Sequence, residues 1–227
     1  MQAPHSRHSK DPGSADSTPE LDQFAAMADG IEKQGFVILP ATLSETLCDN
    51  LLDYLTVLEQ DQFHAAGVGR GTGASHNSLV RRDSIHWIEE EHPASEQWLA
   101  WAKRLRLYLN SRLFLGLFSF ESHFSIYRRG DFYRRHVDAF KGERNRVLSL
   151  VVYLNKGWEP GHGGELQLFH PATNAELVKV MPGYGTVVLF LSEEFPHEVL
   201  PTQCDRYAVA GWFRVNTSAT SAIDPSR

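Results

Sequence analysis

The strongest constraint on the fold of this chain is a change of pattern near Leu117. Beyond this point, short runs rich in β-branched and aromatic residues alternate with Gly, Pro and Asn turns, and no helical periodicity separates them. Strands that follow one another in this way pair into sheets and must bury one face against another layer. The pattern therefore predicts a β-sandwich or barrel, with strands at residues 118–127, 147–154, 165–169, 186–191 and 206–214.

The residues before Leu117 have a different, mainly helical pattern. Apolar residues between Leu21 and Ile31 recur at helical spacing, and leucines at 47, 51, 55 and 58 lie on one face of a second segment, 44–60. A third helix is expected at about 94–114, and a short strand at 36–40. The sequence thus predicts an α+β protein, an all-β core with flanking helices.

Length and composition indicate one folded domain with polar ends. A chain of 227 residues that is 42% hydrophobic buries a sizeable core without a disulfide or metal. We expect a disordered N-terminal tail (1–16), a helical support region (17–115), a β-barrel (116–215) and a frayed C-terminal tail (216–227).

Charge, cysteine content and hydropathy argue against a nucleic-acid-binding, membrane-spanning or secreted disulfide-rich protein. The net charge of −6 gives nucleic acid and anionic membranes no overall attraction for the chain, and the apolar runs are too short to span a bilayer. Cys48 and Cys204 lie far apart, which disfavours a secreted disulfide framework. The sequence predicts a cytoplasmic monomer with neither nucleic acid nor membrane as a partner.

Three residues form a candidate metal site. His136 and Asp138 stand two positions apart, a spacing that on a strand places both side chains on one face, and His197 follows later in the chain. Two histidines and one carboxylate on one face of an octahedron leave three positions of Fe(II) open. Arg206 follows His197 by nine residues across the turn 201–205, so we expect it to begin the neighbouring antiparallel strand. A small diacid would then bind the metal at one end and Arg206 at the other.

Each of these features has a simpler explanation when taken alone. A lone strand histidine is more often hydrogen-bonded in a core than bound to a metal. A non-catalytic barrel or a zinc-dependent hydrolase is a different class of function, but a hydrolytic zinc needs no clamp for a diacid. Asp138 and Arg206 therefore favour iron.

Further motifs resemble one known family. Tyr127 and Tyr133 precede His136 at fixed spacing, and they are followed in order by VYLNKGW at 152–158, GGEL at 163–166, PHEV at 196–199 and RYA at 206–208. This order resembles the Fe(II)- and 2-oxoglutarate-dependent dioxygenases, and within them the prolyl 4-hydroxylases of the hypoxia-sensing type and their bacterial relatives. The resemblance implies a double-stranded β-helix (jelly-roll) barrel supported by the N-terminal helices.

The resemblance also implies roles for individual residues. Iron would be bound by His136, Asp138 and His197, and Arg206 would hold the distal carboxylate of 2-oxoglutarate. The remaining cosubstrate pocket would be formed by Tyr153, Tyr127, Leu166 and Trp212. The family couples hydroxylation to oxidative decarboxylation of 2-oxoglutarate with O2, which yields succinate and CO2. The resemblance also suggests that ascorbate serves as a reductant and that the enzyme senses oxygen.

The substrate implied by the resemblance is a protein loop that contains a target proline, elongation factor Tu among the bacterial relatives. Residues 80–88 (VRRDSIHWI) resemble a mobile substrate-covering loop and its following strand, and four glycines at 67–73 predict a mobile loop over 63–82. The substrate would be contacted by Arg81, Asp83, Tyr133 and Arg146. Hydroxylation of a small molecule or of another side chain is the alternative, because an iron site sets the reaction type and not the substrate.

One segment has a local charge opposite to that of the whole chain. Between residues 128 and 146, seven basic residues stand against three acidic ones. This basic rim would steer the dianionic cosubstrate, dock an acidic protein surface, contact RNA or simply be solvated. RNA is the weakest of these alternatives, since the segment lacks an interleaved aromatic platform. The basic residues are Arg128, Arg129, Arg134, Arg135, Lys141, Arg144 and Arg146.

Overall fold

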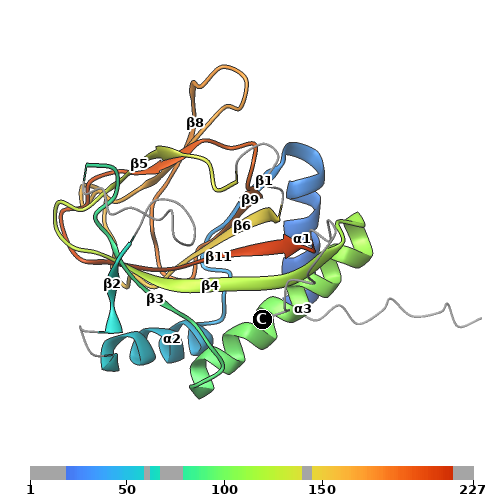
Figure 1. The fold of residues 1–227 in the computed structure, drawn as a ribbon, viewed down its shortest axis with the longest axis horizontal. Helices are drawn as coiled ribbons and strands as arrows, with labels where there is room; N and C mark the ends of the chain where they lie inside the picture. Colours follow the sequence, from blue (N-terminus) through green and yellow to red (C-terminus); the bar gives the residue numbers. More distant parts are fainter. Residues whose placement is uncertain (1–18, 59–61, 67–78, 140–144, 217–227) are drawn as a thin grey trace, which may run out of the picture.

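The computed structural model describes residues 19–58, 62–66, 79–139 and 145–216, and shows helices packed on one side of a β-barrel (Figure 1). The helices in this part of the chain are α1 (Pro19–Gln34), α2 (Glu45–Val57) and α3 (Pro93–Leu113). None of the described helices has the length and apolar character needed to cross a membrane. The expectations for the tails 1–16 and 217–227 and for the glycine loop 67–73 lie outside the described residues.

The helix ends follow from local hydrogen bonding. Ser44 precedes α2, and its hydroxyl accepts a hydrogen bond from the Leu47 N–H at 3.3 Å. α3 begins at Pro93 after His92, whose Nδ1 accepts from the Ala94 N–H at 3.2 Å. The predicted helices at 44–60 and 94–114 are confirmed to within a turn.

The strands form two antiparallel sheets that face each other. The larger sheet has the order β1 (Phe36–Leu39), β9 (Val187–Leu191), β6 (Arg146–Tyr153), β11 (Arg206–Val215), β4 (Leu117–Tyr127), β3 (Ser84–Trp87) and β2 (His64–Ala65). The smaller sheet has the order β5 (Tyr133–His136), β10 (His197–Val199), β7 (Leu166–Phe169) and β8 (Glu176–Val180). This arrangement confirms the predicted jelly-roll barrel.

The two faces of the larger sheet have different tasks. Its outer face carries Phe124, Leu150 and Val209, which share one buried cluster with the apolar faces of the helices. α3 is also fixed to β4 by a hydrogen bond of 3.0 Å from Trp98 Nε1 to Ser122 Oγ. Because side chains alternate along a strand, the neighbouring residues point into the barrel, where Tyr127, Tyr153 and Ala208 belong to a second cluster. The helices thus support the sheet from outside and leave its inner face for the site.

The structure corrects two placements expected from the sequence. β5 ends at His136, and Asp138 lies in the bend that follows instead of on the strand. Arg206 does begin a strand, but β11 pairs with β4 and β6 in the larger sheet, whereas His197 lies on β10 in the smaller one. The turn 201–205 therefore crosses from one sheet to the other and brings Arg206 to the facing wall of the barrel.

Several short strands were not predicted. β8 lies at an edge of the smaller sheet and mixes charged with apolar residues, and β10 has only three residues, so neither has a clear pattern of its own. The region 17–115 is also more than a helical support, since it contributes β1, β2 and β3 to the larger sheet.

A buried histidine on the inner face gives the fold a pH dependence. His123 on β4 is 3% exposed and lies edge-on between Trp87 and Trp212. Burial, with the nearby charge of Arg81, lowers the pKa of His123 to about 4. The unfolded chain therefore binds more protons than the folded one between about pH 6.5 and pH 4, so stability falls as the pH falls through this window.

We expect the replacement His123→Met to weaken this pH dependence. A buried histidine with a lowered pKa reduces the free energy of unfolding by up to about 1.4 kcal/mol for each pH unit below pH 6.5. The methionine side chain does not titrate, so the variant lacks this contribution. Urea unfolding of both proteins at pH 7.5, 6.5 and 5.5 measures the effect. Equal loss of stability in the two proteins over this range would contradict the assignment.

Candidate metal centre

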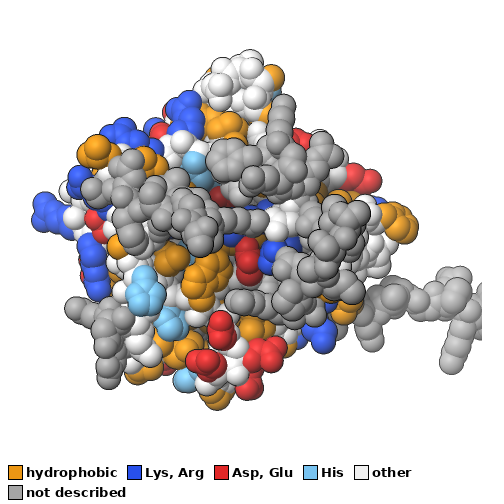
Figure 2. Space-filling model, viewed as in Figure 1, with side chains coloured by type: hydrophobic (Ala, Val, Ile, Leu, Met, Phe, Trp, Pro, Cys, Tyr) orange, Lys and Arg blue, Asp and Glu red, His pale blue; other side chains and the backbone are white. Residues whose placement is uncertain are grey.

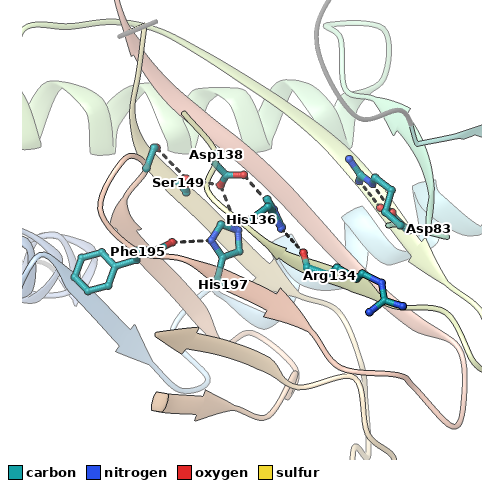
Figure 3. A network of polar contacts seen from close by, with 9 residues as sticks. Asp83, Arg134, His136, Asp138, Ser149, Phe195 and His197 are labelled. Carbon is teal, nitrogen blue, oxygen red and sulfur yellow. Dashed lines mark hydrogen bonds and ion pairs between the residues drawn. The ribbon is translucent and has the colours of Figure 1, made fainter. Parts of the chain in front are cut away.

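Three side chains converge inside the mouth of the barrel (Figure 3). Nε2 of His136 lies 3.5 Å from Oδ1 of Asp138, and Nε2 of His197 lies 3.6 Å from Oδ2 of the same carboxylate. The ligand atoms of all three residues lie within 4.8 Å of one another. His136 and His197 are direct partners across the β5–β10 pair, which is why residues far apart in the sequence meet here.

Both histidines have a fixed tautomer. Nδ1 of His136 lies 2.8 Å from the carbonyl oxygen of Arg134, and Nδ1 of His197 lies 2.9 Å from that of Phe195. Since a carbonyl oxygen only accepts, each Nδ1 carries the proton and donates it. The lone pairs of both Nε2 atoms then point toward Asp138, ready for a cation.

Asp138 is oriented by serines from the larger sheet. Ser149 Oγ on β6 donates to Asp138 Oδ2 at 2.6 Å and lies 2.9 Å from Ser192 Oγ, as Figure 3 shows in part. The Asp138 N–H donates to the Ser192 carbonyl at 3.2 Å. Sequence reasoning missed Ser149. The available signal was a single serine in the otherwise apolar middle of β6, four residues before Tyr153 and therefore on the same inward face of the strand.

The electrostatics favour the metal-binding protonation state. Burial alone would raise the pKa of Asp138, but His197, His136 and the Ser149 hydrogen bond together hold it below its ordinary value. Burial, with the neighbouring His136, lowers the pKa of His197 to about 4. At neutral pH the carboxylate is therefore ionised and His197 is neutral, as metal ligation requires.

Arg206 reaches the same space from the facing sheet. Its side chain is 2% exposed, Nε donates to the Gly164 carbonyl at 2.8 Å, and Cζ lies 4.8 Å and 4.9 Å from the ring centroids of Tyr127 and Tyr153. Among the described residues no carboxylate pairs with Arg206. A buried cation of this kind needs an anion, because desolvation without a partner costs several kcal/mol.

Two further residues support this pocket for an anion. Burial raises the pKa of Tyr153 to about 12, so it stays protonated. Its buried hydroxyl lies beside the Arg206 guanidinium, which only donates, and the O–H has no acceptor among the described residues. Gly164 has φ +68°, and a Cβ at this position would lie 3.0 Å from Cδ of Arg206. Glycine is therefore required both by the backbone conformation and by the close approach of the arginine.

The other predicted pocket residues lie around these groups. Leu166 belongs to the inner cluster, and Trp212 is 8% exposed with a buried Nε1 that has no partner among the described residues. Arg146 lies over the Trp212 ring at 3.6 Å and pairs with Glu121 at 2.8 Å.

The predicted substrate residues form a column beside the metal site. Tyr133 stacks on His136 with a centroid distance of 3.6 Å, and Cζ of Arg81 lies 4.3 Å from the Tyr133 ring on β5. Arg81 in turn donates two hydrogen bonds, of 2.7 and 2.6 Å, to Asp83. Asp83 is completely buried, so in this structure its carboxylate holds Arg81 in place and is not open to a substrate.

The residues present fit an iron ion and a dicarboxylate cosubstrate. Two histidines and a carboxylate form the facial set of ligands typical of non-haem Fe(II). The buried Arg206 and the unsatisfied Tyr153 hydroxyl then offer charge and a hydrogen-bond donor to a carboxylate at the far end of the cavity.

Comparisons with known proteins agree with this site. Residues 122–214, which include all three candidate ligands and Arg206, match the 2OG-Fe(II) oxygenase superfamily. The human prolyl hydroxylase EGLN3 is 32% identical in an alignment of 198 positions that covers 81% of this chain and 80% of that protein.

Solved structures show the same fold. A Pseudomonas putida prolyl-4-hydroxylase superposes with a TM-score of 0.76 at 38% identity, over 85% of this chain and 98% of that one. A Trichoplax adhaerens prolyl hydroxylase in complex with a hypoxia inducible factor peptide fragment has a TM-score of 0.76 at 24% identity, over 86% of this chain and 90% of that one. On its ligand set, fold and relatives, the chain belongs to the Fe(II)- and 2-oxoglutarate-dependent dioxygenases, in the prolyl hydroxylase group of that superfamily.

Proposed function

We propose that this enzyme hydroxylates a prolyl residue at C4 in a protein substrate and converts 2-oxoglutarate to succinate and CO2 in the same reaction. The observation that carries the proposal is the pairing of the His136, Asp138 and His197 set with a buried Arg206 on the opposite wall. The prolyl hydroxylases of Pseudomonas putida and human, both similar over most of their length, support proline as the target.

The chain's own residues provide binding and orientation. His136, Asp138 and His197 would hold Fe(II), which together with 2-oxoglutarate and O2 supplies the oxidising power for the C–H bond. Arg206 and the Tyr153 hydroxyl would hold the distal carboxylate, and Ser149 fixes Asp138. The apolar inner cluster, which includes Leu166, Tyr127 and Val199, excludes water from the cavity.

We propose that Arg81, Tyr133 and Arg146 contact the substrate, and that Asp83 acts through Arg81. The proposal is supported by Tyr133, which stacks on His136, by Arg81, which lies over the Tyr133 ring, and by Arg146, whose charge acts on Tyr133. Elongation factor Tu is the first candidate substrate on the resemblance to bacterial relatives. Four further expectations stay predictions: that the enzyme is a monomer, that it is cytoplasmic, that it uses ascorbate as a reductant and that it senses oxygen.

Removal of one metal ligand should abolish turnover without unfolding the protein. We expect Asp138→Ala and His136→Ala to lose succinate formation by more than about a hundredfold, since two ligands hold Fe(II) poorly. The folded state is held by the two apolar clusters, so circular dichroism and the urea midpoint should change little. Either variant with wild-type succinate production would refute the assignment of the ligands.

Replacement of Arg206 should act on the cosubstrate. Arg206→Ala removes a charge-assisted pair that contributes about 2 kcal/mol or more, so the KM for 2-oxoglutarate should rise at least about thirtyfold. Gly164→Ala should raise the same KM, because a Cβ there would press on Cδ of Arg206. As a control, Gly157→Ala also replaces a glycine of positive φ, but there the added Cβ meets nothing within 4 Å. A KM equal to that of the wild type in Arg206→Ala would overturn this role.

A protein substrate and a small metabolite are distinguished by intact-mass analysis. Purified elongation factor Tu and a cell extract are incubated with enzyme, Fe(II), 2-oxoglutarate and O2, and a protein should gain the mass of one oxygen atom on a proline. Asp138→Ala under the same conditions is the control. Efficient hydroxylation of free proline or another metabolite, with no mass gain in any protein, would support the alternative.

A further inference from the structure

The strand that carries the first metal ligand also presents two arginines to solvent. Arg134 and Arg135 lie on β5 directly before His136, and both side chains are exposed. The Arg134 N–H donates to the Val80 carbonyl at 2.8 Å, and its carbonyl oxygen accepts from His136 Nδ1. The main chain of Arg134 is therefore fixed beside the metal site.

Aromatic rings lie next to the guanidinium groups, and Nε of Arg134 also donates a hydrogen bond to the Leu79 carbonyl. Cζ of Arg134 lies 5.4 Å from the ring centroid of Phe132, which Arg82 approaches at 5.1 Å, and Cζ of Arg135 lies 3.3 Å from the centroid of Phe169. Because successive side chains of a strand point to opposite faces, Arg134 and Arg135 flank β5, which is an edge strand of the smaller sheet. We call Arg82, Phe132, Arg134 and Arg135, which surround this edge, the β5 arginine surface. A guanidinium stacked on a ring keeps its N–H edge available for a carboxylate and loses little side-chain entropy on binding.

Arg134 and Arg135 form no ion pair with the residues that the structure describes. Among the described residues no carboxylate lies within ion-pair distance of either one, and Glu198 on the neighbouring strand β10 is no exception. Other arginines nearby are different, because Arg81, Arg128 and Arg146 pair with Asp83, Asp205 and Glu121.

The surface view shows how these charges are distributed. In Figure 2, Lys and Arg side chains gather at the upper left, the side on which Figure 1 labels β5, while Asp and Glu gather along the lower edge. In a chain of net charge −6, a basic surface beside the site favours a negatively charged partner there.

We propose that the β5 arginine surface docks an acidic segment of the protein substrate, an inference that rests on the prolyl hydroxylase function proposed above. Residues of a strand advance about 3.3 Å each, so Arg134 lies two residues, or about 7 Å along β5, from His136. The acidic side chains of the substrate should therefore lie within about five residues of the target proline.

The test measures the charge preference of binding. Three fluorescent peptides of equal length carry a central proline flanked by Glu, Gln or Lys, and are titrated onto the enzyme loaded with Fe(II) and 2-oxoglutarate without O2. The Glu peptide should bind about tenfold tighter than the Gln peptide. This preference should largely disappear between about 50 mM and about 500 mM NaCl.

Charge reversal provides the decisive comparison. The double variant Arg134→Glu and Arg135→Glu should prefer the Lys peptide, a gain that a misfolded protein does not produce. Lys33→Glu with Lys103→Glu, exposed positions on α1 and α3, changes the net charge equally and should keep the preference for Glu. Equal affinity of the wild type for all three peptides, or an unchanged preference after reversal, would overturn the proposal.

Two further outcomes distinguish the docking surface from a nucleic-acid site and from the proposed hydroxylase function. A single-stranded RNA that displaces the Glu peptide and binds more tightly through Arg134 and Arg135 would assign the surface to nucleic acid instead. The intact-mass experiment reports separately on hydroxylation. Proline hydroxylation without any charge preference would therefore remove the docking surface and leave the proposed function intact.

Discussion

The direct pairing of His136 with His197 across β5 and β10 is the contact on which the rest of the site depends. It places two imidazoles next to each other at the mouth of the barrel, with ring centroids 4.2 Å apart, and each is held by a main-chain carbonyl that fixes the proton on Nδ1. The strand ends immediately after His136, and this end allows Asp138 to turn back toward the Nε2 atoms of both histidines. A continuation of β5 would direct the chain away from the histidines.

The larger sheet completes the site because its two faces are used differently. Helices α1, α2 and α3 cover the outer face with apolar side chains, so the inner face can carry polar groups without loss of the core. Ser149 and Arg206 both lie on this inner face, one beside Asp138 and the other between Tyr127 and Tyr153. The candidate ligands His136 and His197 on the smaller sheet and Arg206 on the larger one thus lie on facing walls of the barrel.

Much of this arrangement could be predicted from the sequence, and the exceptions have physical reasons. Long strands and helices have strong periodicity, so β4, β11 and α3 were expected close to their observed bounds. β10 has three residues and β8 is a mixed edge strand, so their pairing is decided by neighbours distant in the chain. The bend at Asp138, the change of sheet before Arg206 and the role of Ser149 are tertiary features that no local pattern reveals. The ligand types, in contrast, were recognisable from spacing and family resemblance.

The central claim is that one cavity holds iron on the smaller sheet and the cosubstrate's far carboxylate on the larger one. A crystal structure of the full chain grown without O2, with Fe(II) and 2-oxoglutarate, measured at the iron absorption edge, tests it most directly. The account predicts one anomalous peak bounded by Nε2 of His136, Nε2 of His197 and the Asp138 carboxylate, with a carboxylate paired to Arg206. Iron bound elsewhere, or a cosubstrate that leaves Arg206 without an anion, would contradict it.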